Sequence, residues 1–159
     1  MVIHAAAGGL GQLLTQIAKL KGATVIGTTS SEEKAEIARA NGADYVVDYG
    51  DLVERVHEIT GGDGATVVYD GVGKTTFNNS MDALGVRGTL ALIGNAGGPV
   101  EPVDVNRLNA GGSLFLTRPT VMHHIRTPEE IDGRIADVFR WIQDGSIHVT
   151  VGQRFERAR

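Results

Sequence analysis

The fold is decided by Val2-Ile3-His4-Ala5-Ala6-Ala7-Gly8-Gly9-Leu10-Gly11, a short apolar run that stops at small residues and three glycines. It leads directly into Gln12-Leu13-Leu14-Thr15-Gln16-Ile17-Ala18-Lys19, whose apolar residues recur at helical spacing. Glycines let a backbone approach a phosphate closely, and the first N–H groups of a helix bind anions. The sequence therefore predicts a phosphate-binding β-turn-α element at residues 2–19, from which the chain is built outward.

The composition is that of a globular domain. Of the 159 residues, 42% are hydrophobic and 21% are charged, and the net charge of -4 offers no extended basic surface for nucleic acid. The absence of cysteine excludes disulfides and thiolate zinc sites. The first residues lack the basic segment of a signal peptide, and no apolar run reaches the roughly 18 residues of a membrane span. We therefore expect a cytoplasmic protein without a membrane or nucleic-acid partner.

Five more apolar segments are predicted to be strands. They are residues 24–28, 44–48, 66–70, 88–94 and 113–117. A further short strand is expected at 147–149, whereas 95–112 is mostly irregular.

Helices are predicted between these strands. Ser30 and Glu33 form a capping-box pattern, and Thr127-Pro128 is a strong start for the last helix, which runs to residue 144. The helix that follows Gly73 is expected to carry Phe77, Met81 and Leu84 on its apolar face.

Strands that alternate with helices form parallel βαβ units with right-handed crossovers. Six such strands predict an α/β fold of three layers, a doubly wound parallel sheet with the Rossmann order 3-2-1-4-5-6. In this order the ligand crevice lies at the carboxyl ends of the first and fourth strands. Both Gly-rich turns, 6–11 and 71–73, fall there. Two independent turns at one crevice favour a dinucleotide site more strongly than either turn alone.

The first turn resembles the dinucleotide fingerprint G-x-G-x-x-G, with Ala6 at the place of the first glycine. Gly8 would let the backbone approach a pyrophosphate, and Gly11 would let the helix pack close to the strand. A plain tight turn is the alternative. The position of the turn after a strand and before a helix, at the start of a βαβ series, favours the functional interpretation.

The end of the second strand bears on which dinucleotide binds. An NAD site usually has a carboxylate about 20 residues after the start of the fingerprint. This chain has Thr28-Thr29-Ser30-Ser31 there, followed by Lys34. Hydroxyls and a cation suit the 2′-phosphate of NADP, which a carboxylate would repel. Alternatively, the serines only cap the helix and Lys34 is solvated, although a capped helix N-terminus also binds anions. The segment therefore predicts NADP(H) rather than NAD(H).

Other enzyme classes lack their motifs. A short-chain dehydrogenase needs Tyr-x-x-x-Lys, but the fourth residues after the three tyrosines are Tyr49, Val53 and Gly73. The carboxylate that a methyltransferase places after strand two is missing as well. The histidines at 4, 57, 123, 124 and 148 show no i, i+4 pairing, which favours surface or packing roles over a metal site. No catalytic acid, base or nucleophile is predicted.

Five motifs follow one another along almost the whole chain. They are His4-Ala5-Ala6-Ala7-Gly8-Gly9-Leu10-Gly11, Ser31-Glu32-Glu33-Lys34, Val67-Val68-Tyr69-Asp70, Ile93-Gly94-Asn95 and Leu116-Thr117-Arg118-Pro119. In this order they resemble the cofactor domain of the zeta-crystallin-like NADPH:quinone oxidoreductases. These enzymes are the zinc-free branch of the medium-chain dehydrogenase/reductase superfamily.

The resemblance implies cofactor-binding residues, grouped here by the part of NADP(H) that each would contact. The pyrophosphate turn would consist of Ala7, Gly8, Gly9, Leu10 and Gly11. The adenosine 2′-phosphate and ribose would be surrounded by Ser30, Lys34 and Tyr49. The nicotinamide side would be lined by Gly71, Asn95, Leu116 and Thr117. Close relatives often carry Ser where this chain has Gly71, so a hydroxyl contact is expected to be lost.

The resemblance also implies a domain organisation. Members of the family carry a preceding GroES-like domain, which supplies half of the crevice and much of the quinone pocket. Here Met1 adjoins the first strand. The expected organisation is therefore an NADP(H)-binding domain at 1–152 and a truncated tail at 153–159, with the GroES-like domain absent.

The activity that the resemblance implies is hydride transfer from NADPH to quinones or related enones. The dinucleotide carries this chemistry, and the protein mainly positions it. An alkenal or enoyl reductase of the same superfamily is a sibling alternative. A non-enzymatic dinucleotide-binding module, a crystallin-like structural protein or an inactive fragment is an alternative of a different class.

The sixth predicted strand, 113–117, lies at a sheet edge. Leu114-Phe115-Leu116 is apolar on both faces, and an uncovered edge exposes unpaired N–H and C=O groups. The resemblance implies a homodimer joined at this strand. Burial under the helix at 127–144 is the alternative, but a helix would cover the face without satisfying the edge groups. We therefore expect a homodimer through 113–117.

Overall fold

The computed structural model describes residues 1–152 and 155–156. Its strands are β1 (Val2–Ile3), β2 (Ile26–Thr29), β3 (Tyr45–Asp48), β4 (Ala65–Asp70), β5 (Leu84–Leu92) and β6 (Phe115–Thr117). Its helices are α1 (Gly9–Leu20), α2 (Glu32–Ala40), α3 (Leu52–Ile59), α4 (Phe77–Asp82), α5 (Asn106–Ala110), α6 (Pro128–Gln143) and the short 3-10 helix η1 (Val121–His123). Of the predicted tail, residues 153–154 and 157–159 lie outside the described residues.

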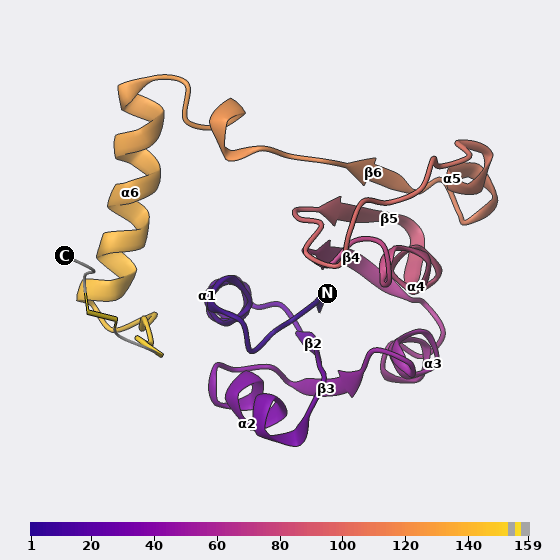
Figure 1. Ribbon diagram of the computed structural model, residues 1–159, viewed down its shortest axis with the longest axis horizontal. Coiled ribbons are helices and arrows are strands. Elements are labelled where there is room, and N and C mark those ends of the chain that lie inside the picture. The colour runs from indigo at the N-terminus through magenta and orange to yellow at the C-terminus, as the bar shows by residue number, and fades with distance from the viewer. Residues whose placement is uncertain (153–154, 157–159) are drawn as a thin grey trace.

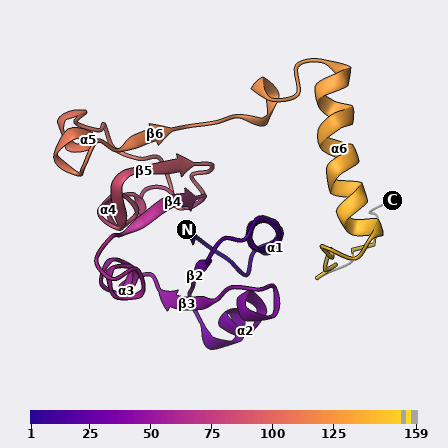
Figure 2. The same ribbon diagram turned by 180° about the vertical axis from the view of Figure 1, so that it is seen from behind.

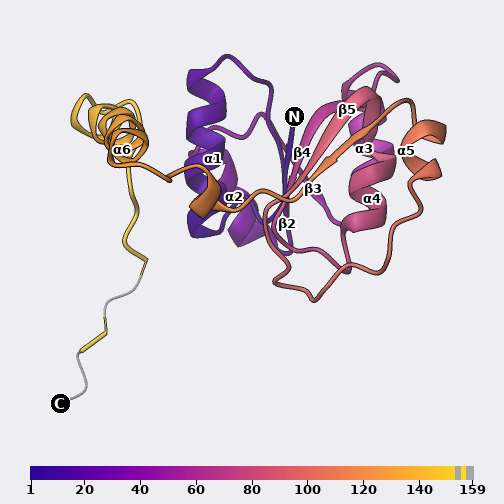
Figure 3. The same ribbon diagram turned by 90° about the horizontal axis from the view of Figure 1, so that it is seen from above.

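The strands form one parallel sheet in the order β3-β2-β1-β4-β5-β6 (Figure 1). This confirms the predicted fold class and strand order. β1 lies at the centre, where Val2 pairs with Ile26 of β2 and with Val68 of β4. Helices α1 and α2 cover one face of the sheet, and α3, α4 and α5 cover the other (Figure 3).

Each face of the sheet has its own apolar core. The larger core packs Val2, Val68 and Leu90 of the central strands against residues of α3 and α4, among them Val56 and Met81. The core on the other face is built mainly from small side chains of the first turn, α1 and α2, together with Ile3 and Val25. Central strands buried on both faces explain why β4 has a continuous apolar centre.

The helix after the second turn is shorter than expected. α4 ends at Asp82, and Leu84 begins β5, where its Cα pairs with Ala65. The prediction that Leu84 belongs to the helix was therefore wrong. The reason is tertiary: Ala65 N donates to Ala83 O at 2.8 Å, and the buried Leu84 packs into the larger core.

Residues 147–149 were predicted as a strand, but these described residues form none. Ile147 is buried, with 2% of its surface exposed. The main chain of His148 pairs with a side chain instead, because His148 N donates to Gln16 Oε1 at 2.8 Å and Gln16 Nε2 donates to His148 O at 3.1 Å. Gln16 thus ties the segment after α6 to α1.

Helix α6 begins as predicted, with Pro128 in its first turn and Thr127 Oγ1 accepting a hydrogen bond from Glu130 N at 3.3 Å. It stands beside α1, away from β6 (Figures 1 and 3). β6 remains at the outer edge of the sheet (Figure 2), and Phe115 is 59% exposed. Among the described residues, no helix combines the length and apolar character needed to span a bilayer.

Candidate functional site

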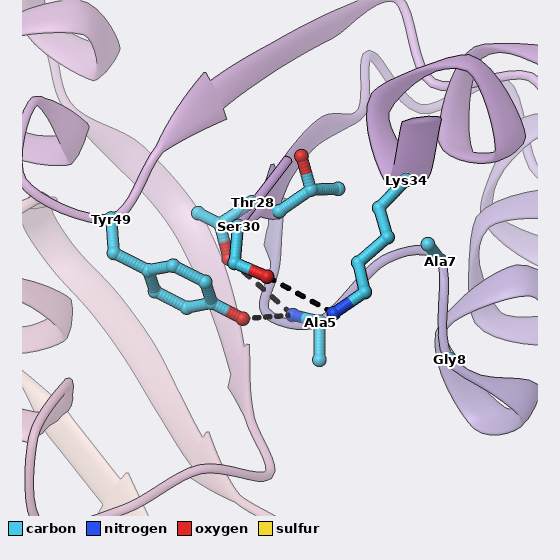
Figure 4. Close-up of a pocket in the computed structure, with 8 residues that line it drawn as sticks. Ala5, Ala7, Gly8, Thr28, Ser30, Lys34 and Tyr49 are labelled. Carbon is cyan, nitrogen blue, oxygen red and sulfur yellow. Dashed lines mark hydrogen bonds between the residues drawn. The ribbon is translucent and has the colours of Figure 1, made fainter. Parts of the chain in front are cut away.

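A cleft of about 170 Å³ opens at the carboxyl ends of β1 and β2 (Figure 4). The residues that line it are Ala5, Ala7, Gly8, Thr28, Thr29, Ser30, Lys34 and Tyr49. They come from the first Gly-rich turn, the end of β2, the start of α2 and the loop after β3. This lining includes one cation and no carboxylate.

The first turn is folded tightly around Ala5. This residue has a φ of 50°, which is uncommon for a residue other than glycine. Gly8 N donates to Ala5 O at 2.8 Å, and Ala6 N donates to Thr28 O of β2 at 3.0 Å. Gly11 packs so closely that a Cβ there would lie 2.3 Å from Ala5 O. The glycine is needed at this position because the start of the helix contacts the turn directly.

The turn presents the start of α1 to the cleft. Gly8 is the N-cap, and the first turn of the helix contains no acidic residue. The N–H groups of Gly9, Leu10 and Gly11 have no carbonyl partners within the helix, as in every helix start. These donors and the helix dipole together suit a phosphate group.

The end of β2 and the start of α2 supply a hydroxyl and a cation. The predicted cap at Ser30 was wrong by one residue: Ser31 is the N-cap, and its Oγ accepts from Lys34 N at 3.4 Å. The Ser30 hydroxyl faces the cleft instead and accepts from Lys34 Nζ at 3.0 Å (Figure 4). Of the two adjacent serines, Ser31 therefore caps the helix and Ser30 pairs with Lys34 at the cleft.

Tyr49 forms the opposite wall of the cleft. Its hydroxyl oxygen accepts a hydrogen bond from Ala5 N at 3.1 Å. Its ring stacks on the ring of His4, with centroids 5.6 Å apart and an angle of 6° between the planes. The ring is thereby held beside the first Gly-rich turn and lines the cleft.

The second Gly-rich turn is organised by Asp70, a fully buried residue at the end of β4. Asp70 Oδ1 accepts from Val72 N at 2.8 Å and from Gly73 N at 2.9 Å. The Thr76 hydroxyl donates to both carboxylate oxygens, and Ser80 Oγ donates to Oδ2 at 2.7 Å. The carboxylate thus fixes the turn and the start of α4 with five short contacts.

The loop after β5 lies against this second turn. A Cβ on Gly73 would be 2.8 Å from Gly98 O and 3.1 Å from the Cα of Asn95. Ala96 N donates to Gly71 O at 3.1 Å. Gly71 and Asn95 are therefore brought together at the carboxyl edge of the sheet.

His4 lies between the two turns and is 5% exposed. Its Nδ1 is 2.9 Å from Thr28 Oγ1, and its Nε2 is 2.9 Å from Ser80 Oγ. Burial lowers the pKa of the His4 imidazole, while the negative charge of Asp70 acts in the opposite direction.

The structure places the predicted cofactor residues along one edge of the sheet. Those that line the cleft are Ala7, Gly8, Ser30, Lys34 and Tyr49. Gly9, Leu10 and Gly11 form the first turn of α1 beside it. The other four lie beyond this cleft: Gly71 and Asn95 follow β4 and β5, and Leu116 and Thr117 belong to β6. The cofactor contacts of all these residues, in the cleft and beyond it, stay predictions.

Sequence reasoning missed several residues of the site. Ala5, Thr28 and Thr29 line the cleft but were not among the predicted cofactor residues. His4 was assigned only a surface or packing role. A signal was present, because a polar residue directly after a central parallel strand lies at the ligand edge of the sheet. In the described ranges, no group of three or more His, Asp or Glu could hold a metal ion.

Comparison with known proteins places these features in a family. A model described as "zinc-binding dehydrogenase" matches residues 9–143. The chain is 44% identical to a 2-haloacrylate reductase from a Burkholderia species, covering 98% of this chain and 47% of that protein. It is 43% identical to a quinone oxidoreductase of Pseudomonas aeruginosa, covering 99% of this chain and 49% of that protein.

Solved structures give the same result. The quinone oxidoreductase of Escherichia coli in complex with NADPH is 44% identical, with a TM-score of 0.91 over 95% of this chain and 47% of that one. A mycobacterial quinone oxidoreductase is 52% identical, with a TM-score of 0.92 over 95% of this chain and 47% of that one. The chain thus spans about half the length of these relatives. By sequence and by fold, it belongs to the zinc-binding dehydrogenase family and is similar within that family to quinone oxidoreductases.

Proposed function

We propose that this chain is the NADP(H)-binding part of a quinone-reductase-like oxidoreductase. The observation that carries the proposal is the pair formed by Lys34 and Ser30 beside the phosphate turn, in a cleft whose lining has no carboxylate. A cation and a hydroxyl at this place favour a 2′-phosphate and offer nothing that would repel it.

The site fits the parts of the dinucleotide in order. Lys34 and Ser30 would hold the adenosine 2′-phosphate, and Tyr49 would pack beside the adenosine. The start of α1 would bind the pyrophosphate through backbone N–H groups, because Gly9 leaves the surface there free of a side chain. The turn at Gly71 and the loop at Asn95 would orient the nicotinamide. When bound, NADPH would supply the hydride for the reaction.

The relatives support the choice of reaction. They include proteins named quinone oxidoreductase and 2-haloacrylate reductase, and one was solved in complex with NADPH. We propose reduction of a quinone or a related activated alkene. A sibling activity on alkenals or enoyl substrates is supported by a relative named acryloyl-coenzyme A reductase, 35% identical over 92% of this chain.

The organisation of the whole protein is part of the proposal. We propose that residues 1–152 act as the cofactor domain and that a second, substrate-binding domain faces the cleft in the complete enzyme. The family description names zinc, but the described residues assemble no set of metal ligands. We therefore propose that this domain contributes no zinc ligand. The cytoplasm is proposed as the default compartment.

We further propose that two copies associate through β6. The strand pairs with β5 on one side only, so its other edge retains N–H and C=O groups that another strand can pair. α6 leaves this edge uncovered (Figures 1 and 2).

The cofactor assignment is tested by calorimetric titration of the chain with NADPH and NADH. Tighter binding of NADPH is expected, because only NADPH places a phosphate beside Lys34. Equal affinity, or tighter binding of NADH, would contradict the assignment.

The reaction is tested by following NADPH oxidation with 1,4-benzoquinone. We expect enzyme-like turnover when the chain is joined to its substrate domain, and little turnover with the chain alone. Turnover by the chain alone would show that a second domain is not needed. NADPH binding without turnover in the complete protein would favour a non-enzymatic dinucleotide-binding module.

A further inference from the structure

His4 makes contacts that a packing role does not require. Both ring nitrogens lie 2.9 Å from a hydroxyl oxygen, one on Thr28 at the cleft and the other on Ser80 of α4. Ser80 in turn donates to Asp70, which holds the second Gly-rich turn. A continuous chain of hydrogen bonds therefore runs from the first turn to the second, across the carboxyl ends of β2, β1 and β4.

The direction of these bonds fixes the tautomer of His4. Ser80 Oγ donates to Asp70 Oδ2 at 2.7 Å, and this bond uses the single hydroxyl hydrogen of Ser80. Ser80 Oγ must then accept from His4, which places a hydrogen on Nε2. In the neutral imidazole Nδ1 carries a lone pair and accepts from the Thr28 hydroxyl.

His4 also supports the strained part of the first turn. Ala5, with a φ of 50°, is held by hydrogen bonds from its N–H to Tyr49 Oη at 3.1 Å and Thr28 Oγ1 at 3.4 Å (Figure 4). His4 contacts both acceptors, because its ring stacks on Tyr49 and its Nδ1 bonds Thr28. A strained backbone conformation persists only where several surrounding contacts hold it in place.

We propose that His4 is a positioning residue for dinucleotide binding. Its neutral imidazole, with the hydrogen on Nε2, couples the phosphate turn at Ala5–Gly8 to the second turn at Gly71–Gly73. The proposal rests on the proposed function, since it assumes that NADPH spans both turns. The ligand would touch the two turns, whereas His4 acts on it only through Thr28, Tyr49, Ser80 and Asp70.

Coupling of this kind has a distinctive consequence. A ligand that spans both turns needs them at the correct separation, whereas a ligand confined to the first cleft does not. Loss of the His4 hydrogen bonds should therefore weaken NADPH far more than adenosine 2′,5′-bisphosphate, which carries the 2′-phosphate but no nicotinamide half. A merely structural histidine would affect both ligands equally.

The test uses His4→Phe, which keeps an aromatic ring to stack on Tyr49 but removes both ring nitrogens. Calorimetry is expected to show an affinity loss of about tenfold for NADPH and less than about twofold for adenosine 2′,5′-bisphosphate. His123→Phe, at an exposed histidine of η1, is the matched control and should change neither affinity. Ser80→Ala should give part of the NADPH loss, and the double variant no more than His4→Phe alone.

Failure of the role proposed for His4 can be distinguished from failure of the proposed function. Equal losses for both ligands, or none, would overturn the role of His4 while leaving NADPH binding intact. Wild-type chain that binds no NADPH would overturn both this role and the proposed function. If His4→Phe does not fold, His4→Gln keeps a donor toward Ser80 and should show a smaller loss with the same selectivity. Nitrogen-15 NMR of the wild-type histidines should show a protonated Nε2 on His4, and a protonated Nδ1 at neutral pH would contradict the assignment.

Discussion

Single contacts around Ala5 decide how the first Gly-rich turn is built. Gly11 touches the backbone of Ala5 and Ala6, whereas a Cβ on Gly9 would meet nothing within 4 Å. Two glycines of one motif therefore have different roles. Gly11 is required by the packing of the helix start on the turn, and Gly9 leaves the surface of the turn without a side chain.

Replacement of these two glycines should separate their roles. Gly11→Ala is expected to lower the free energy of unfolding by about 1–3 kcal/mol, because the new Cβ overlaps the backbone of the turn. Gly9→Ala, the matched control, should change it by less than about 0.5 kcal/mol. Urea denaturation measures both values. Equal effects would show that the close packing at Gly11 is not what constrains this turn.

Lys34 should select NADPH through one charge. Lys34→Ala is expected to weaken NADPH binding about 10- to 100-fold and NADH binding less than about twofold, since it removes a charge-assisted contact to the 2′-phosphate. Lys21→Ala, at an exposed lysine near Trp141, is the control. Comparable losses for the two dinucleotides would mean that Lys34 acts through the fold.

His4 should make stability depend on pH. Because its pKa is lowered from 6.5 in the folded state, the unfolded chain binds the proton more readily. The contribution of His4 to the free energy of unfolding is therefore fully present above the pKa of the unfolded chain. It is lost as the pH falls toward the lower pKa of the folded state. Between about pH 7.5 and about pH 5.5, His4→Phe should show a smaller decrease in unfolding free energy than wild type in urea titrations. An identical decrease in both proteins would contradict this origin.

At the scale of elements, β6 and β3 are the two edges of the sheet, but they differ in character. β6 is a short apolar strand whose Phe115 is largely exposed, and β3 carries Tyr45 and Asp48 at its ends. An apolar edge strand favours pairing with another chain, and charge on an edge opposes it.

The proposed dimer should therefore respond to charge on one edge only. Phe115→Lys is expected to shift the chain from dimer to monomer in sedimentation velocity measurements, whereas Tyr45→Lys on the opposite edge should leave the dimer unchanged. A wild-type chain that sediments as a monomer at all concentrations would rule out association through β6 in this part of the protein.

At the scale of the whole molecule, the position of α6 depends on few contacts. Its own residues include none that are buried, and the segment after it is tied to α1 by Gln16. Gln16 also donates to Asn41 at 2.9 Å. One amide side chain thus connects α1, the end of α2 and the segment after α6.

Loss of this amide should release α6 without disturbing the sheet. Gln16→Leu removes the hydrogen-bond partner of both His148 N and Asn41 Oδ1. We expect the free energy of unfolding to fall by about 1–3 kcal/mol. Hydrogen exchange should increase at residues 128–149 and stay unchanged in β4 and β5. Gln143→Leu, at the exposed end of α6, is the control. Unchanged exchange in α6 would show that other contacts hold the helix.

The amino-acid pattern was sufficient to predict the sheet and its strand order. The crevice was predicted at the ends of the first and fourth strands, whereas the cleft opens at the ends of β1 and β2. Apolar periodicity and glycine turns are local properties, and the handedness of βαβ units leaves few ways to connect them. Gly8, Ser30 and Lys34 were predicted to bind the cofactor from their local patterns and Tyr49 from the family resemblance, and all four line one cleft. They lie in three segments that a parallel sheet brings to one edge.

Packing in three dimensions set the finer arrangement. It placed Leu84 in β5, moved the cap from Ser30 to Ser31, and paired His148 with a side chain in place of a strand. It also joined His4 to Ser80, which is 76 residues away in the chain. Such contacts depend on which buried polar atoms find partners once the core has formed, and this follows from the packing of distant segments rather than from any local pattern.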